Sequence, residues 1–334
     1  MKFLSEASTV LSFKFFELGC DAMFKYSIKR LIEAVPIWLA ITLIVFLLMN
    51  YIPGDPVAQL MDARSGAMDE AVIEQIREEW GLNDPLHMQY FGFLKNVVQG
   101  DLGTSYQSRM DVTTILAERI PVTIQITILG LAIAIIVGIS SGIISAMKRG
   151  SWIDTFVSSS SIAGVSIPAF FLGLILMYLF AVIFSWLPAS GYKPGEIKFL
   201  ILPSITLGLS VSGVIARITR SSMIDVLKMD YMMTSYAKGL SKVRIIAIHA
   251  MKNALPPVLT IIGVQLGLLL SGAVITETIF GLPGVGRLLI DSILQRDLPI
   301  VQGCVIFIAT VFLVVNLLTD ISCRMIDPRV RSNT

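Results

Sequence analysis

Long apolar runs alternate with short polar segments along most of the chain. Residues 31–51 form a 21-residue run whose one charge is Glu33, and residues 121–147 form a run of 27 residues without a charge. A helix needs about 20 apolar residues to cross the roughly 30 Å hydrocarbon core of a bilayer. The pattern therefore predicts transmembrane helices at about 31–51, 121–147, 156–186, 199–216, 253–276 and 298–319.

The third of these spans is the least regular. Residues 155–192 are 38 uncharged residues, which is too long for one straight crossing. Pro168 and Pro188 indicate a kink and an exit, because proline lacks the backbone N–H that a helix needs. The predicted fold class is all-α, a polytopic membrane protein with six transmembrane helices.

Composition supports the same class. The chain is 54% hydrophobic and 15% charged, with a mean hydropathy of +0.77, whereas soluble domains carry about 25% charged residues. Residues 1–22 are interrupted by charges and lack the apolar core of a signal peptide, so we interpret them as an N-terminal extension, with Met23 as an alternative start. The three cysteines show no ligand spacing, and we predict no metal site.

Residues 217–253 are the longest charged interruption among the later apolar runs. Helical spacing of Met223 and Leu227 with Tyr231 and Thr234 predicts one amphipathic helix that ends at Lys238. Gly239 can adopt the left-handed conformation that closes a helix, and a serine two residues later can cap the next one. The sequence predicts helix, glycine turn, helix.

The distribution of lysine and arginine predicts the orientation. With both termini in the cytoplasm, the cytoplasmic segments hold 17 of these residues and the external segments 9. Positive charge is enriched in cytoplasmic loops. The segment 217–253 is therefore expected on the cytoplasmic side, and the loop 52–120 on the external side.

The residues around the glycine turn also match a known motif. They are Asp230, Tyr231, Thr234, Ala237, Lys238, Gly239, Leu240 and Ser241, followed by His249, Asn253 and Pro257. This pattern resembles the cytoplasmic EAA loop of ABC importer permeases, and most of all the dipeptide, oligopeptide, nickel and glutathione group. Ser235 stands where that group usually has alanine. The resemblance covers residues 23–331.

The resemblance implies a type I ABC importer permease fold in the bacterial inner membrane, and a loop that fits into a cleft of an ATPase subunit. It also implies four partners: a homologous second permease, two cytoplasmic ATP-binding subunits and an external solute-binding protein. The expected solutes are di- or oligopeptides. Glutathione and nickel or its chelates are alternatives, because no residue here identifies the solute.

Other functions find less support in the sequence. The chain has no Gly-Lys pair and thus no P-loop, so we expect it to be no enzyme and to hold no cofactor. A stand-alone secondary transporter is expected to show an inverted repeat and ionisable groups at the membrane midplane, and neither is visible. A structural scaffold would leave the matched glycine turn unexplained.

Few polar residues interrupt the later spans. Amides in hydrocarbon need partners from another helix or from water, so Gln265 and Asn316 are the first candidates to line a pathway, with Ser212 and Glu277 behind them. Glu277 has two interpretations, a solute or ion site and a carboxylate that accepts from nearby backbone N–H groups, and we favour the second. Two glycine pairs, Gly138 with Gly142 and Gly263 with Gly267, indicate close helix contacts within the bundle or at a dimer seam.

Overall fold

The computed structural model describes residues 27–48, 50–51, 74 and 83–326. Residues 1–22, and residues 52–73 and 75–82 of the loop 52–120, lie outside the described residues, and with them nearly all of a helix that the sequence pattern places at 69–80. Within them the chain is helical, and the only pairing of strand type is one isolated bridge between Thr104 and Asp111. The predicted all-α class is confirmed.

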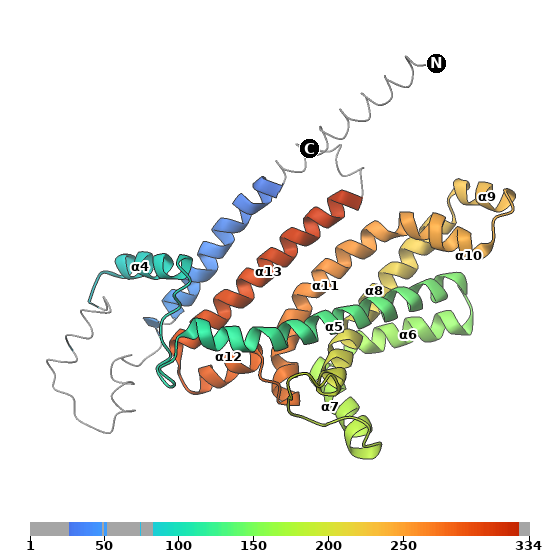
Figure 1. Ribbon diagram of the computed structural model, residues 1–334. Helices are drawn as coiled ribbons and strands as arrows, with labels where there is room; N and C mark the ends of the chain where they lie inside the picture. The colour runs from blue at the N-terminus through green and yellow to red at the C-terminus, as the bar shows by residue number, and fades with distance from the viewer. Residues whose placement is uncertain (1–26, 49, 52–73, 75–82, 327–334) are drawn as a thin grey trace, which may run out of the picture.

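Long helices make up the bundle, and shorter ones lie at its two ends (Figure 1). Their bounds are Ser27–Leu48 for the first helix, then α4 Leu86–Val98, α5 Val112–Met147, α6 Trp152–Ser166, α7 Ala169–Met177, the π-helix η1 Tyr178–Ile183, α8 Lys198–Leu227, α9 Asp230–Ala237, α10 Lys242–Arg244, the π-helix η2 Ile245–Ala250, α11 Met251–Phe280, α12 Val285–Leu294 and α13 Leu298–Ile326.

Five described helices are long and apolar enough to cross a membrane, and a bent pair brings the number to six if the pair counts as one span. The pair is α6 and Ala169–Ile183, which meet at an angle of 105°. Ile167 is extended, with φ −80° and ψ 122°, because Pro168 excludes the helical conformation from the residue before it. The single third span predicted at 156–186 is therefore a broken helix.

Three helices extend beyond the predicted spans. Helix α5 begins at Val112, nine residues before the predicted start at Pro121, because Val112 and Leu116 pack into a cluster with α12 and α13. Helix α8 continues to Leu227 rather than ending at 216, and the helix that contains α11 begins at Lys242 rather than at 253. Hydropathy marks only the part of a helix in hydrocarbon, whereas tertiary packing keeps the polar ends helical.

Glycines allow α5 and α8 to pack closely along their length. A β-carbon on Gly138 would meet Ile215, and one on Gly142 would meet Ala216 and Thr219. Since both positions advance together along the chain, α5 and α8 run parallel. Small residues let helix backbones approach closely in a membrane.

Helix α13 runs antiparallel to α11. Gly263 lies against Thr319, and Gly267 lies against Phe312. Both glycine pairs singled out in the sequence therefore serve contacts within this chain.

The first helix runs antiparallel to α13. Arg30 forms an ion pair with Asp320 at 3.3 Å, and Trp38 Nε1 donates to Thr310 Oγ1 at 3.0 Å. These pairings and those of α11 with α13 direct the start of the first helix and the end of α13 towards the end of the bundle that carries α9 and α10. We call this the elbow end, and the end that carries α12 the far end (Figure 1).

Candidate functional site

The candidate site is the elbow, residues 230–241, between α8 and the helix that leads into α11. Helix α8 ends at Leu227, and Lys228 and Met229 form a turn with the hydrogen bonds Lys228 N to Asp225 O and Met229 N to Val226 O. The single helix predicted up to Lys238 is therefore wrong, because two helical segments occupy this stretch. The reason is packing, since the turn lets Met232 enter the core while Tyr231 stays 38% exposed.

Gly239 ends α9 as the sequence predicts. Its φ is +72°, and Lys238 N donates to Thr234 O at 3.1 Å in the last turn before it. A residue with a β-carbon is strained by about 1 to 2 kcal/mol in this conformation. Ser241 then begins α10, with its Oγ accepting from Arg244 N at 3.4 Å.

An apolar cluster fastens the elbow to the bundle. It joins the ends of α5, α8, α9 and the start of the α11 segment through Ala146, Met223, Val226, Met232, Ile245, Ala250 and Ala254. Leu240 packs against it from the turn itself. The elbow is therefore held on its inner side by side chains from four parts of the chain.

A polar contact adds to this cluster. Asn253 Nδ2 donates to Tyr231 Oη at 2.7 Å and to His249 O at 3.2 Å. The structure thus brings together Tyr231 and Asn253, two motif residues that are 22 positions apart in sequence, and their bond joins the two sides of the elbow.

The outer side of the elbow is open. Asp230, Thr234, Ala237, Lys238 and Gly239 are exposed, and a β-carbon on Gly239 would meet no atom of this chain within 4 Å. Met233 of the elbow and Val243 of α10, just after it, are 75% and 77% exposed. This outer surface therefore presents exposed apolar side chains, and at Gly239 another molecule can approach its backbone closely.

The four candidate pathway residues differ in their partners and burial. Gln265 is buried, and its Nε2 donates to Val211 O of α8 at 3.4 Å. Ser212 donates to Leu209 O of its own helix at 3.0 Å, which is the usual partner of a hydroxyl in a span. Asn316 is half-buried on α13.

Glu277 lies at the far end and has no exposed surface. Its Oε1 accepts from Thr123 Oγ1 at 2.6 Å, and its Oε2 accepts from Arg287 N at 3.0 Å in the first turn of α12. A β-carbon on Gly284 would overlap the carboxylate. The contacts match the second interpretation, a carboxylate that receives backbone N–H groups where the chain enters α12.

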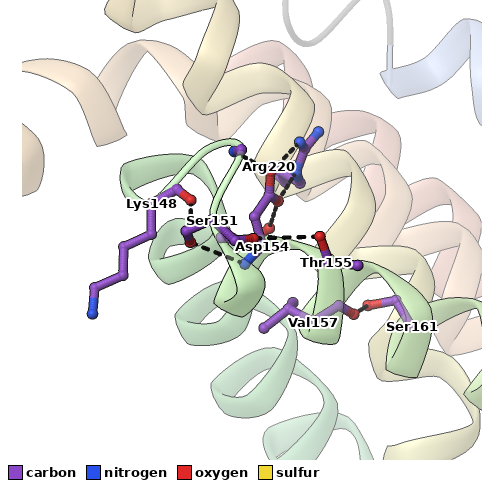
Figure 2. A network of polar contacts seen from close by, with 9 residues as sticks. Lys148, Ser151, Asp154, Thr155, Val157, Ser161 and Arg220 are labelled. Atoms are coloured by element: carbon purple, nitrogen blue, oxygen red, sulfur yellow. Dashed lines mark hydrogen bonds and ion pairs between the residues drawn. The ribbon is translucent and has the colours of Figure 1, made fainter.

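Sequence reasoning missed two buried carboxylates. Asp154, at the start of α6, accepts two hydrogen bonds from the guanidinium of Arg220 of α8, from Nε at 2.7 Å and from Nη2 at 2.8 Å (Figure 2). The signal was the spacing Ser151-x-x-Asp154, which marks a helix start. The other is Asp297. It accepts from Ser105 Oγ at 2.5 Å and from the backbone N–H groups of Tyr106 and Gln107, the two residues that follow Ser105.

No group of three potential metal ligands occurs among the described residues. The site consists of an exposed turn on an apolar base.

The chain matches two families described for one kind of transport component. Residues 134–332, which include the elbow, match the family described as binding-protein-dependent transport system inner membrane component. Residues 23–127 match the N-terminal family described for the same membrane component.

The relatives cover nearly the whole chain. A protein of Brucella abortus (strain 2308) whose name describes a peptide transport system permease protein is 43% identical over 91% of this chain and 98% of its own length. The glutathione transport system permease protein GsiC of Pectobacterium atrosepticum is 43% identical over 92% of this chain and 99% of its own, and that of Escherichia coli (strain K12) is 39% identical over the same shares.

The fold also matches a solved structure. The methionine ABC transporter MetNI, in an inward facing conformation, aligns with a TM-score of 0.53 at 17% identity over 64% of this chain and 96% of that one. The chain therefore belongs to the family of binding-protein-dependent transport system inner membrane components and is a multi-pass permease subunit of an ABC importer.

Proposed function

We propose that the elbow is the part of this permease that docks on ATPase subunits and passes their movement to the membrane helices. The single observation behind the proposal is an exposed Gly239 turn whose outer side is bare and whose inner side is fixed to four parts of the chain. A contact between two subunits can couple their movements only if the free energy of that contact differs between two states of the assembly. A rigid base lets a small displacement at the turn move whole helices.

We further propose the assembly that the elbow serves. It contains this chain, a homologous second permease, two cytoplasmic ATP-binding subunits and an external solute-binding protein. Hydrolysis of ATP belongs to the ATP-binding subunits, since this chain has no P-loop. The family description names dependence on a binding protein, which supports the last partner.

The proposed orientation places the elbow end and both termini in the cytoplasm. The excess of lysine and arginine on the predicted cytoplasmic segments supports it. The contact of Arg30 with Asp320 also supports it, because it joins the start of the first helix to the end of α13.

Di- or oligopeptides are the proposed solutes, with glutathione and nickel or its chelates as alternatives. Relatives over nearly the full length carry names that refer to peptide and glutathione transport, and glutathione is itself a tripeptide. Uptake of labelled dipeptides, glutathione and Ni²⁺ by cells with and without the transporter separates the three. Uptake of Ni²⁺ alone would contradict the peptide proposal.

Gly239→Asp tests the docking role. The aspartate strains the turn and puts a charged side chain on the open surface, so ATPase subunits should no longer co-purify with the permease and uptake should stop. Gly195→Asp is the matched control, because Gly195 at the far end has φ +83° and the same open surroundings. Normal co-purification and uptake for the Gly239 variant, at matched membrane abundance, would show that the elbow is not the docking element.

A further inference from the structure

A buried ion pair lies at the elbow end, where α5 turns into α6. Asp154 is 6% exposed, and its Oδ1 accepts from Ser145 Oγ at 2.5 Å and from Arg220 Nε at 2.7 Å. Its Oδ2 accepts from Arg220 Nη2 at 2.8 Å and from Gly150 N at 2.9 Å. Figure 2 shows the guanidinium facing the carboxylate, while the Lys148 side chain points away. Such a two-bond pair fixes both distance and orientation.

This pair is a buried attachment of α6 to α8. All fifteen residues of α6 are described, and Asp154 is the only buried one among them. At its other end α6 stops at the bend before Pro168, so the next helix does not continue its axis. A second close contact runs to the same partner helix, because a β-carbon on Gly213 of α8 would meet the backbone of Ser161. Helix α6 therefore packs mainly against α8, with α5 as its other neighbour.

Helix α8 is also the helix that enters the elbow. Arg220 lies seven residues before its last residue, Leu227, and α9 begins at Asp230. Between these points Met223 and Val226 pack with Ala146 at the end of α5. The α5–α6 turn thus contacts α8 through an ion pair and through apolar side chains, both next to the elbow.

We propose that Asp154 and Arg220 are positioning residues that make α6 move with α8 when the elbow moves. The inference rests on the proposed docking role of the elbow and adds the connection by which its movement reaches α6. Without the pair, α8 still receives the ATPase movement, but α6 no longer follows it with a fixed orientation. ATP hydrolysis then proceeds with little transport.

Asp154→Asn tests this role in the assembled transporter. The amide keeps the shape of the side chain but loses the charge that orients Arg220. Permease abundance, co-purified ATPase, ATP hydrolysis and uptake of a labelled mixture of dipeptides and glutathione are measured in the same membrane vesicles. We expect uptake per ATP hydrolysed to fall about tenfold, within the usual range of coupling between sites, with co-purification of the ATPase unchanged.

Asp320→Asn is the matched control. It removes an ion pair of the same residue types, Asp320 with Arg30 at 3.3 Å, which joins two other helices and is more exposed. We expect its uptake per ATP to stay within about twofold, as for an exposed pair of small free energy.

A second variant keeps the test open if Asp154→Asn fails to insert. Arg220→Lys retains the positive charge, but an ammonium cannot form two parallel bonds. Intermediate uptake per ATP at normal abundance supports the proposal. Unchanged uptake per ATP in either variant, or a loss that abundance or ATPase co-purification fully explains, overturns it. Failure of the docking role itself is seen separately, as retained co-purification in Gly239→Asp.

Discussion

The side chain of Asn253 donates a hydrogen bond to the Tyr231 hydroxyl at 2.7 Å, across 22 residues of sequence. Tyr231 belongs to α9, before the Gly239 turn, and Asn253 belongs to α11, after it. Both residues are exposed at their side chains. The bond therefore braces the elbow at the surface, above the apolar cluster that holds it from inside.

Removal of this bond should weaken ATPase docking without preventing insertion. Tyr231→Phe keeps the ring and deletes the hydroxyl, and one such bond contributes about 1 kcal/mol. We expect the dissociation constant between permease and ATPase to rise about fivefold, measured by titration in detergent. Tyr178→Phe is the control, because Tyr178 is exposed on η1, away from the elbow. An equal change in both variants would speak against the brace.

Glu277 should prove structural rather than solute-binding. In Glu277→Gln an N–H group replaces one acceptor oxygen and faces either Thr123 or the Arg287 N–H, so we expect a loss of about 1 to 3 kcal/mol in stability. Thermal unfolding of the purified permease measures it. Glu118→Gln, an exposed change on α5, should have no effect. Altered solute selectivity at normal stability would favour a solute or ion site instead.

Reporters fused at two positions should lie on opposite sides of the membrane. One follows Gln99, after α4, and the other follows Lys242, at the start of α10. The antiparallel and parallel helix pairings place these positions at different ends of the bundle. We expect alkaline phosphatase activity only from the first fusion and green fluorescence only from the second. If both reporters lay in the same compartment, the six-span topology would be refuted.

The permease alone should neither bind nor hydrolyse ATP. It lacks the Gly-Lys-Ser/Thr sequence that holds phosphates. Equilibrium binding of a fluorescent ATP analogue and a phosphate-release assay on the homogeneous chain check this, with the complete transporter as the positive control. Measurable turnover by the chain alone would refute the assignment of hydrolysis to its partners.

Local chemistry accounts for much of the elbow. Gly239 ends α9 and Ser241 caps α10 as their residue types predict, because backbone freedom and a side-chain acceptor act within a few residues. The number of apolar runs likewise predicts the spans, since the length needed to cross a bilayer is the same wherever a helix lies. These features belong to the sequence itself.

Helix limits required the tertiary structure. The helical spacing of Met223, Leu227 and Tyr231 runs across the break after Leu227, where the cluster buries Met232 while Tyr231 stays exposed. In the same way, α5 begins at Val112 because α12 and α13 lie against it. A contact between distant segments outweighs helix propensity, which contributes under 1 kcal/mol per residue for most residues.

Partners across the bundle were also decided only by the tertiary structure. The sequence shows Gly138 and Gly142 as a close-packing pair but not that Ile215 and Thr219 face them. It shows Asp154 and Arg220 as charges at two span ends, 66 residues apart, but not as one pair. The sequence alone determined which segments are apolar enough to cross a membrane and that the chain turns at Gly239, because those depend on local residue chemistry. Which helix faces which depends on how the spans pack together, and only that arrangement joins the elbow to the rest of the permease.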